Sequence, residues 1–268
     1  MNEYRTIEVD FSDGVIDVTL NRPDRLNAIN IDMAEELAEA ADRFAHRENA
    51  KVLVLRGAGR AFSAGADVGS TADDANGETS VAARINGHAR MQKALASIET
   101  LPVVKIAQVH GHCVGAGLVL ASMCELRIAG SDAQFSVPEL AFGIPFSMGG
   151  LPRLVRYVGL TKAADMVLTG RRVGAQEARD AGLITRVVDS SDLGRVVAET
   201  AEQLSAHPKY LVLETVERLR EAGVALLEGS RSDLSSLVLA TLDAESRQVM
   251  EEYARRILSK KRTKDKKQ

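Results

Sequence analysis

The spacing of apolar positions divides the first third of the chain into short strands and an amphipathic helix. Two runs with alternating apolar side chains, Thr6 to Phe11 and Gly14 to Leu20, flank a Ser-Asp-Gly turn and predict a β-hairpin. Apolar residues at helical spacing predict a helix from about Asp32 to Arg47, with Asp32 able to cap it. The apolar run from Lys51 to Leu55 predicts a short strand that enters a glycine-rich turn.

Strands and helices continue to alternate up to about residue 191, and the pattern beyond Asp192 is helical only. The expected helices before that point are about Val81 to Glu99 and one through Leu154 to Val158, and the expected strands are Val103 to Val109, Leu126 to Ala129 and Gln134 to Ser136. The expected helices after it are Leu193 to Ser205, Pro208 to Leu227 and Asp233 to Leu258. This order predicts an α/β core in residues 1–191, a helical region in residues 192–258, and a basic tail in residues 259–268 that we expect to be disordered.

Composition narrows the class of protein. A chain of 268 residues with 45% hydrophobic residues is long enough for one large domain with a helical appendage. The net charge of −3 argues against a nucleic-acid-binding protein. No apolar run reaches the ~18 to 20 residues that a membrane span needs, and the N-terminus lacks an apolar signal core, so we expect a soluble cytoplasmic protein that does not bind membranes.

Cysteine and histidine spacing gives no sign of a disulfide framework or a metal centre. The two cysteines, Cys113 and Cys124, have neither a disulfide nor a zinc spacing, and we expect both to be small buried residues. The five histidines form no H-x-x-x-H pair. We therefore expect no metal site.

Two loops rich in small residues are the strongest chemical signal. Val109 to Leu120 contains a strand end, a turn and the start of a helix at Gly115-Ala116-Gly117, where backbone N–H groups have no partner within the helix. A second loop, Ala61 to Asp67, also follows an apolar strand. Together the two loops can direct a pair of backbone donors at one developing negative charge, which is an oxyanion hole.

Five motifs in register resemble the crotonase, or enoyl-CoA hydratase/isomerase, family over roughly residues 5 to 257. They are Asn21-Arg22-Pro23 with Asn27-Ala28, F-S-A-G-A-D at 62–67, H-G-x-x-x-G-A-G at 110–117, A-Q-F-S-V-P-E at 133–139 and G-G-L-P-R-L at 149–154. The resemblance implies a spiral of ββα turns followed by helices that assemble homotrimers, often paired into dimers of trimers. It also implies an acyl-CoA thioester as ligand, so that CoA is part of the substrate and no separate cofactor is needed.

The same resemblance implies roles for individual residues. The thioester oxygen would lie between the backbone N–H groups of Ala66 and Ala116, in agreement with the oxyanion hole inferred from the two loops. The residues implied for CoA binding are Arg25, Leu26, Ala64, Asp67 and Val68, and Lys260 of a neighbouring subunit near the adenosine phosphate. Arg25 suits a phosphate because its charge is permanent, whereas Asp67 has the alternative of tying down its own loop. The basic tail that contains Lys260 has the alternatives of a solvated chain end or an RNA contact, and the slightly acidic remainder of the chain speaks against RNA.

The carboxylates depart from the family pattern. Family hydratases carry one glutamate two residues after the G-x-G of the second loop, where this chain has Val119, and a second glutamate in the P-E turn, which is present here as Glu139. Efficient hydration of a 2-enoyl-CoA uses both, whereas one carboxylate can take a proton from C2 and return it at C4. We therefore expect Glu139 to be the single acid/base and double-bond isomerisation to be favoured.

Several alternatives stay open. The chain could hydrate 2-enoyl-CoA with water or another carboxylate, such as Glu125, Asp73, Asp74 or Glu78, or it could bind acyl-CoA without catalysis. The apolar neighbours Val137, Leu140, Ala141 and Phe142 could desolvate Glu139 and raise its pKa. The residues expected to shape the acyl pocket are Val119, Phe146, Ser147 and Met148. Ser147 lacks the G-x-S-x-G context of a serine nucleophile.

Overall fold

The computed structural model describes residues 4–67, 81–224, 242, 247–252 and 254–255. The predicted hairpin is confirmed as β1 (Ile7–Ser12) and β2 (Val15–Leu20), which pair antiparallel. Asp13 and Gly14 form the two-residue turn between them, and both have positive φ. A two-residue hairpin turn needs this conformation to match the twist of the two strands.

The order of elements repeats a ββα unit four times. After the hairpin come the short 3-10 helix η1 (Pro23–Arg25) and α1 (Ile31–Ala45). The next units are β3 (Val52–Gly57), β4 (Ala61–Ser63) and α2 (Val81–Thr100), then β5 (Val104–Val109), β6 (His112–Val114) and α3 (Ala116–Ser122), then β7 (Leu126–Gly130), β8 (Gln134–Ser136), the 3-10 helix η3 (Glu139–Phe142) and α4 (Gly150–Thr169). The chain continues with β9 (Val173–Gly174), α5 (Ala175–Asp180), β10 (Arg186–Val188), α6 (Leu193–Ser205) and α7 (Lys209–Val224). The expected α/β architecture is confirmed.

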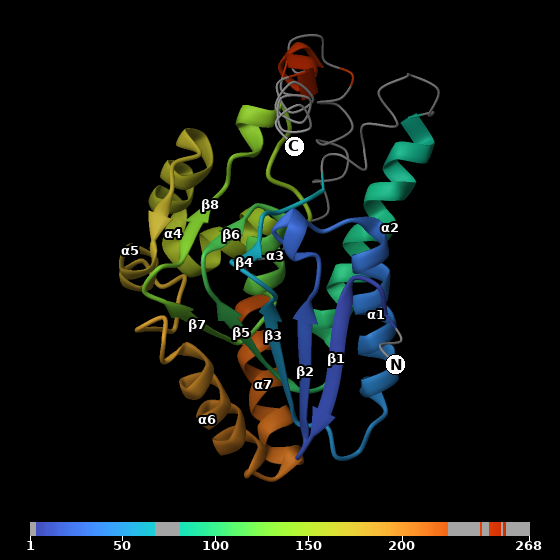
Figure 1. Ribbon diagram of the computed structural model, residues 1–268, viewed down its shortest axis with the longest axis vertical. Coiled ribbons are helices and arrows are strands. Elements are labelled where there is room, and N and C mark those ends of the chain that lie inside the picture. The colour runs from blue at the N-terminus through green and yellow to red at the C-terminus, as the bar shows by residue number, and fades with distance from the viewer. Residues whose placement is uncertain (1–3, 68–80, 225–241, 243–246, 253, 256–268) are drawn as a thin grey trace, which may run out of the picture.

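The two strands of each later unit separate into two sheets (Figure 1). The larger sheet has the order β1-β2-β3-β5-β7-β10, and the smaller has the order β4-β6-β8-β9. In the smaller sheet β4 pairs parallel with β6, and β6 pairs parallel with β8. Because neighbouring parallel strands end at the same edge, the segments that follow β4, β6 and β8 meet there. Those segments contain the two glycine-rich loops and the P-E turn.

Strand β3 contributes to two apolar cores because its side chains alternate between the faces of the larger sheet. Leu53 and Leu55 belong to the main core together with residues of α1. Val52 and Val54 belong to a second core under α6, together with Leu193, Val197 and Ala201 of that helix and Ile106 and Ile128 of the sheet. The larger sheet is therefore covered on both faces, as expected for parallel strands joined by helical crossovers.

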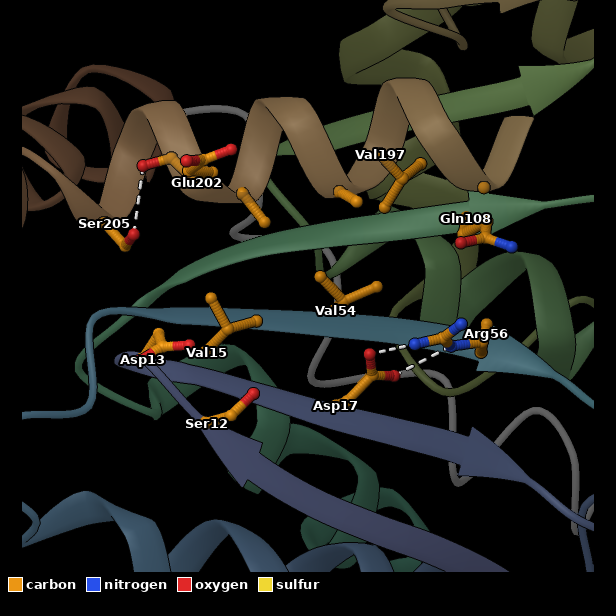
Figure 2. A pocket seen from close by; sticks show the side chains of 13 residues that line it. Ser12, Asp13, Val15, Asp17, Val54, Arg56, Gln108, Val197, Glu202 and Ser205 are labelled. Atoms are coloured by element: carbon orange, nitrogen blue, oxygen red, sulfur yellow. Dashed lines mark hydrogen bonds and ion pairs between the residues drawn. The ribbon is translucent and has the colours of Figure 1, made fainter. Parts of the chain in front are cut away.

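Beside the second core, a groove of about 400 Å³ lies between α6 and strands β2 and β3 (Figure 2). An ion pair between Asp17 on β2 and Arg56 on β3 lies in this groove. None of the predicted acyl-CoA site residues that the structure describes lines this groove. No helix in the described part of the chain is both long and apolar enough to cross a membrane.

Some local predictions were wrong. Asp32 does not cap α1, because the side chain of Asn30 accepts the Met33 N–H and Asp32 instead lies in the first helical turn. β4 and β6 form within segments predicted as loop and turn, and β9, α5 and β10 were not predicted. Helix α4 extends well beyond the predicted Leu154 to Val158, across a non-helical residue at Gly159.

The C-terminal predictions are tested only in part. Helices α6 and α7 confirm the first two predicted after Asp192, and residues 247–252 are helical within the predicted third. The rest of Asp233 to Leu258, and the tail of residues 259–268, lie outside the described residues.

Candidate functional site

Glu139 lies two residues after Val137, at the start of η3, with its side chain almost fully buried at 9% exposure. Its Oε2 atom has no hydrogen-bond partner among the described residues. Burial raises the pKa of the Glu139 carboxyl to about 7, against a smaller lowering by the Glu139 backbone N–H. A carboxyl with a pKa near neutrality and a free oxygen is suited to accept a proton and to return it.

The burial of Glu139 does not come from all of the expected neighbours. Val137 is fully buried, but Leu140 is 48% exposed and Ala141 is also exposed. The carboxyl group instead packs against the second glycine-rich loop, where a Cβ on Gly115 would clash with Oε1 and lie 3.3 Å from Cδ. Gly115 also has φ of 49° and ψ of −118°, a conformation that favours glycine. The carboxyl of Glu139 therefore lies at the N-terminal end of α3.

Ala116 is the first residue of α3 and follows Gly115 directly. Its N–H is one of the donors that an α-helix leaves without an internal partner. Within the described ranges the Ala116 N–H donates no hydrogen bond, whereas the preceding Gly115 N–H donates to Ser136 O at 3.1 Å. The chain thus presents a backbone donor beside the Glu139 carboxyl.

Ala66 supplies the corresponding donor from the first loop. It forms an isolated parallel bridge with Ile29, in which the Ile29 N–H donates to Gly65 O at 2.8 Å and the Asp67 N–H donates to Ile29 O at 2.9 Å. In this pattern the Ala66 N–H points away from Ile29, and it donates no hydrogen bond to any residue that the structure describes.

The two loops lie against each other. A Cβ on Gly65, which has φ of +97°, would lie 2.9 Å from Val114 O and 3.7 Å from Ala116 N. A Cβ on Gly117 would lie 2.7 Å from the Cβ of Ser63. The absence of side chains at these glycines lets the two backbone segments approach closely. Two backbone donors and one carboxyl oxygen that have no hydrogen-bond partner in the described ranges therefore belong to adjoining segments.

The residues predicted for CoA binding occupy different environments. Arg25 is exposed on η1, and its side chain makes no hydrogen bond or ion pair with the described residues. Leu26 caps η1 in a left-handed conformation, and its carbonyl accepts the Ala64 N–H at 2.8 Å. Asp67 is paired with Arg22 at 2.8 Å, which supports the alternative that it ties down its loop. Val68 and Lys260 lie outside the described residues.

The residues predicted for the acyl pocket are all buried. Val119 is 1% exposed in the main core, one helical turn after Gly115, whose carbonyl accepts its N–H at 3.0 Å. The ring of Phe146 packs on Gly150, where a Cβ would lie 2.5 Å from a ring carbon. Ser147 and Met148 are each 9% exposed. A glutamate at position 119 would thus place its carboxylate in apolar surroundings.

Glu125, one of the substitutes considered for the glutamate absent at position 119, is engaged by other groups. Glu125 accepts the backbone N–H of Lys105 at 2.8 Å, pairs with the buried Lys105 Nζ at 3.1 Å, and pairs with Arg220 of α7 at 3.1 Å. Its role is therefore to join β5 and α7 to the end of α3. Asp73, Asp74 and Glu78, the other substitutes considered, lie outside the described residues.

The cysteines and His207 lie apart from the predicted site residues in the fold or are buried. Cys113 and Cys124 are buried as expected, and burial raises the pKa of the Cys124 thiol to about 12. His207, which follows Ser147 in sequence, lies near the end of α6, where its carbonyl accepts Lys51 Nζ at 3.0 Å. Among the described residues, no group of three or more His, Cys, Asp and Glu side chains is placed to hold a metal ion.

Comparison with known proteins identifies the family to which the chain belongs. The sequence profile of the family described as "Enoyl-CoA hydratase/isomerase" matches residues 10–256. A probable enoyl-CoA hydratase, echA8, of Mycobacterium bovis is 37% identical over 225 residues, which cover 83% of this chain and 85% of that protein. The peroxisomal Delta(3,5)-Delta(2,4)-dienoyl-CoA isomerase of Arabidopsis thaliana is 32% identical over 84% of this chain and 86% of that protein.

A solved structure gives the same result for the fold. The crystal structure of an enoyl-CoA hydratase/isomerase from Xanthobacter autotrophicus Py2 superposes with a TM-score of 0.86 and 30% sequence identity, over 94% of each chain. The profile match covers nearly the whole chain, and the relatives carry the names of hydratases and isomerases. The chain is therefore an enzyme of the enoyl-CoA hydratase/isomerase family.

Proposed function

We propose that the chain moves the double bond of an enoyl-CoA thioester between C3 and C2, with Glu139 as its single acid/base. Glu139 takes the proton from C2, and the electron pair of that C–H bond delocalises over the double bond and the thioester carbonyl. The backbone N–H groups of Ala66 and Ala116 stabilise the negative charge on the carbonyl oxygen. Glu139 then returns the proton at C4, and the double bond comes to lie between C2 and C3.

The observation that carries this proposal is the Glu139 carboxyl itself. It is buried, and its Oε2 has no partner among the described residues. It packs against Gly115, which directly precedes Ala116. Burying an ionisable group without a partner costs free energy, so a protein that only bound acyl-CoA would be more stable with an apolar residue there. This cost favours a catalyst over a non-catalytic binding protein.

Val119 favours isomerisation over hydration. Hydration needs one group to activate water and another to deliver a proton, and a missing acid or base typically lowers the rate by ~10²- to 10⁴-fold. Hydration is nevertheless the second candidate, because relatives such as the 2,3-dehydroadipyl-CoA hydratase of Escherichia coli, 33% identical to this chain, are named for it. That reaction would require water or another carboxylate in place of the glutamate absent at position 119.

The proposal extends to binding and assembly. It assigns CoA binding to Arg25, Leu26, Ala64 and Val68, and to Lys260 of a neighbouring subunit, with the permanent charge of Arg25 meeting a CoA phosphate. CoA enters as part of the substrate, so no separate cofactor takes part. The helical region after residue 191 assembles homotrimers or dimers of trimers, and the protein acts in the cytoplasm.

Incubation with 3-enoyl-CoA and with 2-enoyl-CoA in D₂O tests the reaction. Wild-type protein should convert 3-enoyl-CoA to 2-enoyl-CoA and form little 3-hydroxyacyl-CoA. Glu139→Gln should lower the rates of conversion and deuterium uptake by ~10²- to 10⁴-fold while acyl-CoA still binds. Faster hydration than isomerisation would establish the second candidate. Binding without turnover of either substrate, over a range of chain lengths, would establish the non-catalytic alternative.

A further inference from the structure

An ion pair between Arg22 and Asp67 lies immediately beside Ala66. The Arg22 Nη2 donates to Asp67 Oδ2 at 2.8 Å, and the Arg22 Nη1 donates to the carbonyl of Ala28 at 2.5 Å. The side chains are largely shielded from solvent, with exposures of 20% for Arg22 and 14% for Asp67. A guanidinium that is shielded from solvent and donates two hydrogen bonds holds its partners more firmly than one in a surface ion pair.

The two bonds of Arg22 join the two backbone segments that fix the direction of the Ala66 N–H. Ile29 exchanges backbone hydrogen bonds with Gly65 and Asp67, the residues on either side of Ala66. Arg22 adds a bond to Ala28, which precedes Ile29, and a bond to the side chain of Asp67, which follows Ala66. The guanidinium therefore connects the two sides of this short parallel pairing next to the donor.

Arg22 is itself held in place. Its backbone N–H donates to Asn27 Oδ1 at 2.9 Å, and its carbonyl accepts the Asn27 N–H at 2.9 Å. The fully buried Asn27 side chain also donates to the carbonyl of Ala61, at the start of β4, at 2.8 Å. The connection thus extends from the first ββα unit to the second.

We propose that Arg22 and Asp67 are positioning residues that orient the Ala66 N–H toward the thioester oxygen. This inference rests on the proposed function, because it assigns a role to a donor that the proposal places in the oxyanion hole. It also assigns the Asp67 carboxylate to Arg22 instead of to CoA. Breaking the ion pair would not remove the Ala66 N–H, but it would allow this N–H to rotate away from the thioester oxygen.

The test measures polarisation of the bound thioester directly. A non-reacting acyl-CoA with a ¹³C-labelled thioester carbonyl is bound to each variant, and its carbonyl stretching frequency is read by isotope-edited infrared difference spectroscopy. In the wild type, the two N–H donors should lower this frequency relative to free acyl-CoA. In Asp67→Asn the lowering should shrink, kcat should fall by about 10- to 10²-fold through misalignment, and the Kd for CoA should change less than 2-fold.

Two further variants separate positioning from general stability. Arg22→Lys keeps the charge but loses the forked bonds to Ala28 and Asp67, so it should show the same changes to a smaller extent. Asp17→Asn breaks the Asp17–Arg56 pair, which also joins neighbouring segments but lies in the groove under α6 (Figure 2). This control should lower the melting temperature without altering the carbonyl frequency or kcat.

Each outcome bears on one of the two proposals. No lowering of the frequency in the wild type would refute the oxyanion hole, and with it the proposed function. A wild-type lowering that persists in Asp67→Asn would overturn the positioning role alone. If Asp67→Asn loses as much affinity for CoA as it loses kcat, Asp67 is a CoA ligand. If Asp17→Asn changes the carbonyl frequency as much as Asp67→Asn does, the Arg22–Asp67 pair has only a structural role.

Discussion

Substituting Gly115 by alanine tests the arrangement of the site with a single methyl group. The new Cβ would overlap Glu139 Oε1, so the carboxyl must move away from the N-terminal end of α3. The backbone at Gly115, with φ of 49° and ψ of −118°, is also unfavourable for alanine and costs about 1–3 kcal/mol. We expect Gly115→Ala to lower the melting temperature by about 2–4 °C per kcal/mol and kcat by at least about 10² through displacement of the base.

Gly159→Ala is the matched control for this experiment. Gly159 also has a backbone conformation open mainly to glycine, with φ of 75° and ψ of 164°, but a Cβ there meets no atom within 4 Å. Calorimetry and steady-state kinetics on both variants separate the backbone strain, which both share, from the displacement of Glu139, which only Gly115→Ala causes. Equal kcat values for the two variants would show that the carboxyl does not act from the position beside α3.

The raised pKa of Glu139 gives further predictions. Because the base must be ionised, kcat/KM should rise with pH to a plateau above about 7, and a profile flat from pH 5 to 9 would contradict the assignment. Since the folded state holds this proton more tightly than the unfolded state, whose pKa is near 4.5, Glu139 should cost stability as pH rises from about 4.5 to 7, by about 3 kcal/mol. Glu139→Gln should remove that cost and be more stable than the wild type at pH 8 by urea unfolding, with kcat lower by ~10²- to 10⁴-fold; equal stability of the two proteins at pH 8 would refute the burial argument. Val119→Glu should destabilise the protein because position 119 is 1% exposed, and it should increase hydration of 2-enoyl-CoA if the variant folds. A folded Val119→Glu protein with unchanged hydration would show that this position alone does not select the reaction.

Elements long enough to show a regular pattern of apolar positions could be predicted from the sequence. Elements stabilised by partners far away in the sequence could not. The hairpin β1–β2, strand β5 and helix α6 each carry enough apolar positions to show their period. Strands β4 and β6 have three residues each and no period. They are strands because β4 and β6 pair with each other, although they lie far apart in the sequence.

The candidate site also combines features that the local sequence reveals with features that depend on contacts between distant segments. The two loops could be recognised locally, because a strand, a run of small residues and a helix start lie next to one another in sequence. The contact between Gly115 and Glu139 could not be recognised, since it depends on the register of β6 against β8. The sequence offered both a CoA contact and a loop-tying role for Asp67, and the ion pair with Arg22, which supports the second role, depends on the fold.

The parallel order of β4, β6 and β8 has a consequence for how such a protein can change its chemistry. Each of three successive ββα units delivers one group to the same edge: a main-chain donor at Ala66, a main-chain donor at Ala116 and a side chain at Glu139. A point substitution that preserves the loop conformations exchanges side chains but cannot delete an amide proton, unless it introduces proline. Under the proposed function, the capacity to stabilise an enolate is carried by the backbone, and the fate of the enolate is decided by interchangeable side chains such as those at positions 119 and 139. The proposal thus implies that new reactions can arise on this scaffold one residue at a time without rebuilding the pair of backbone donors.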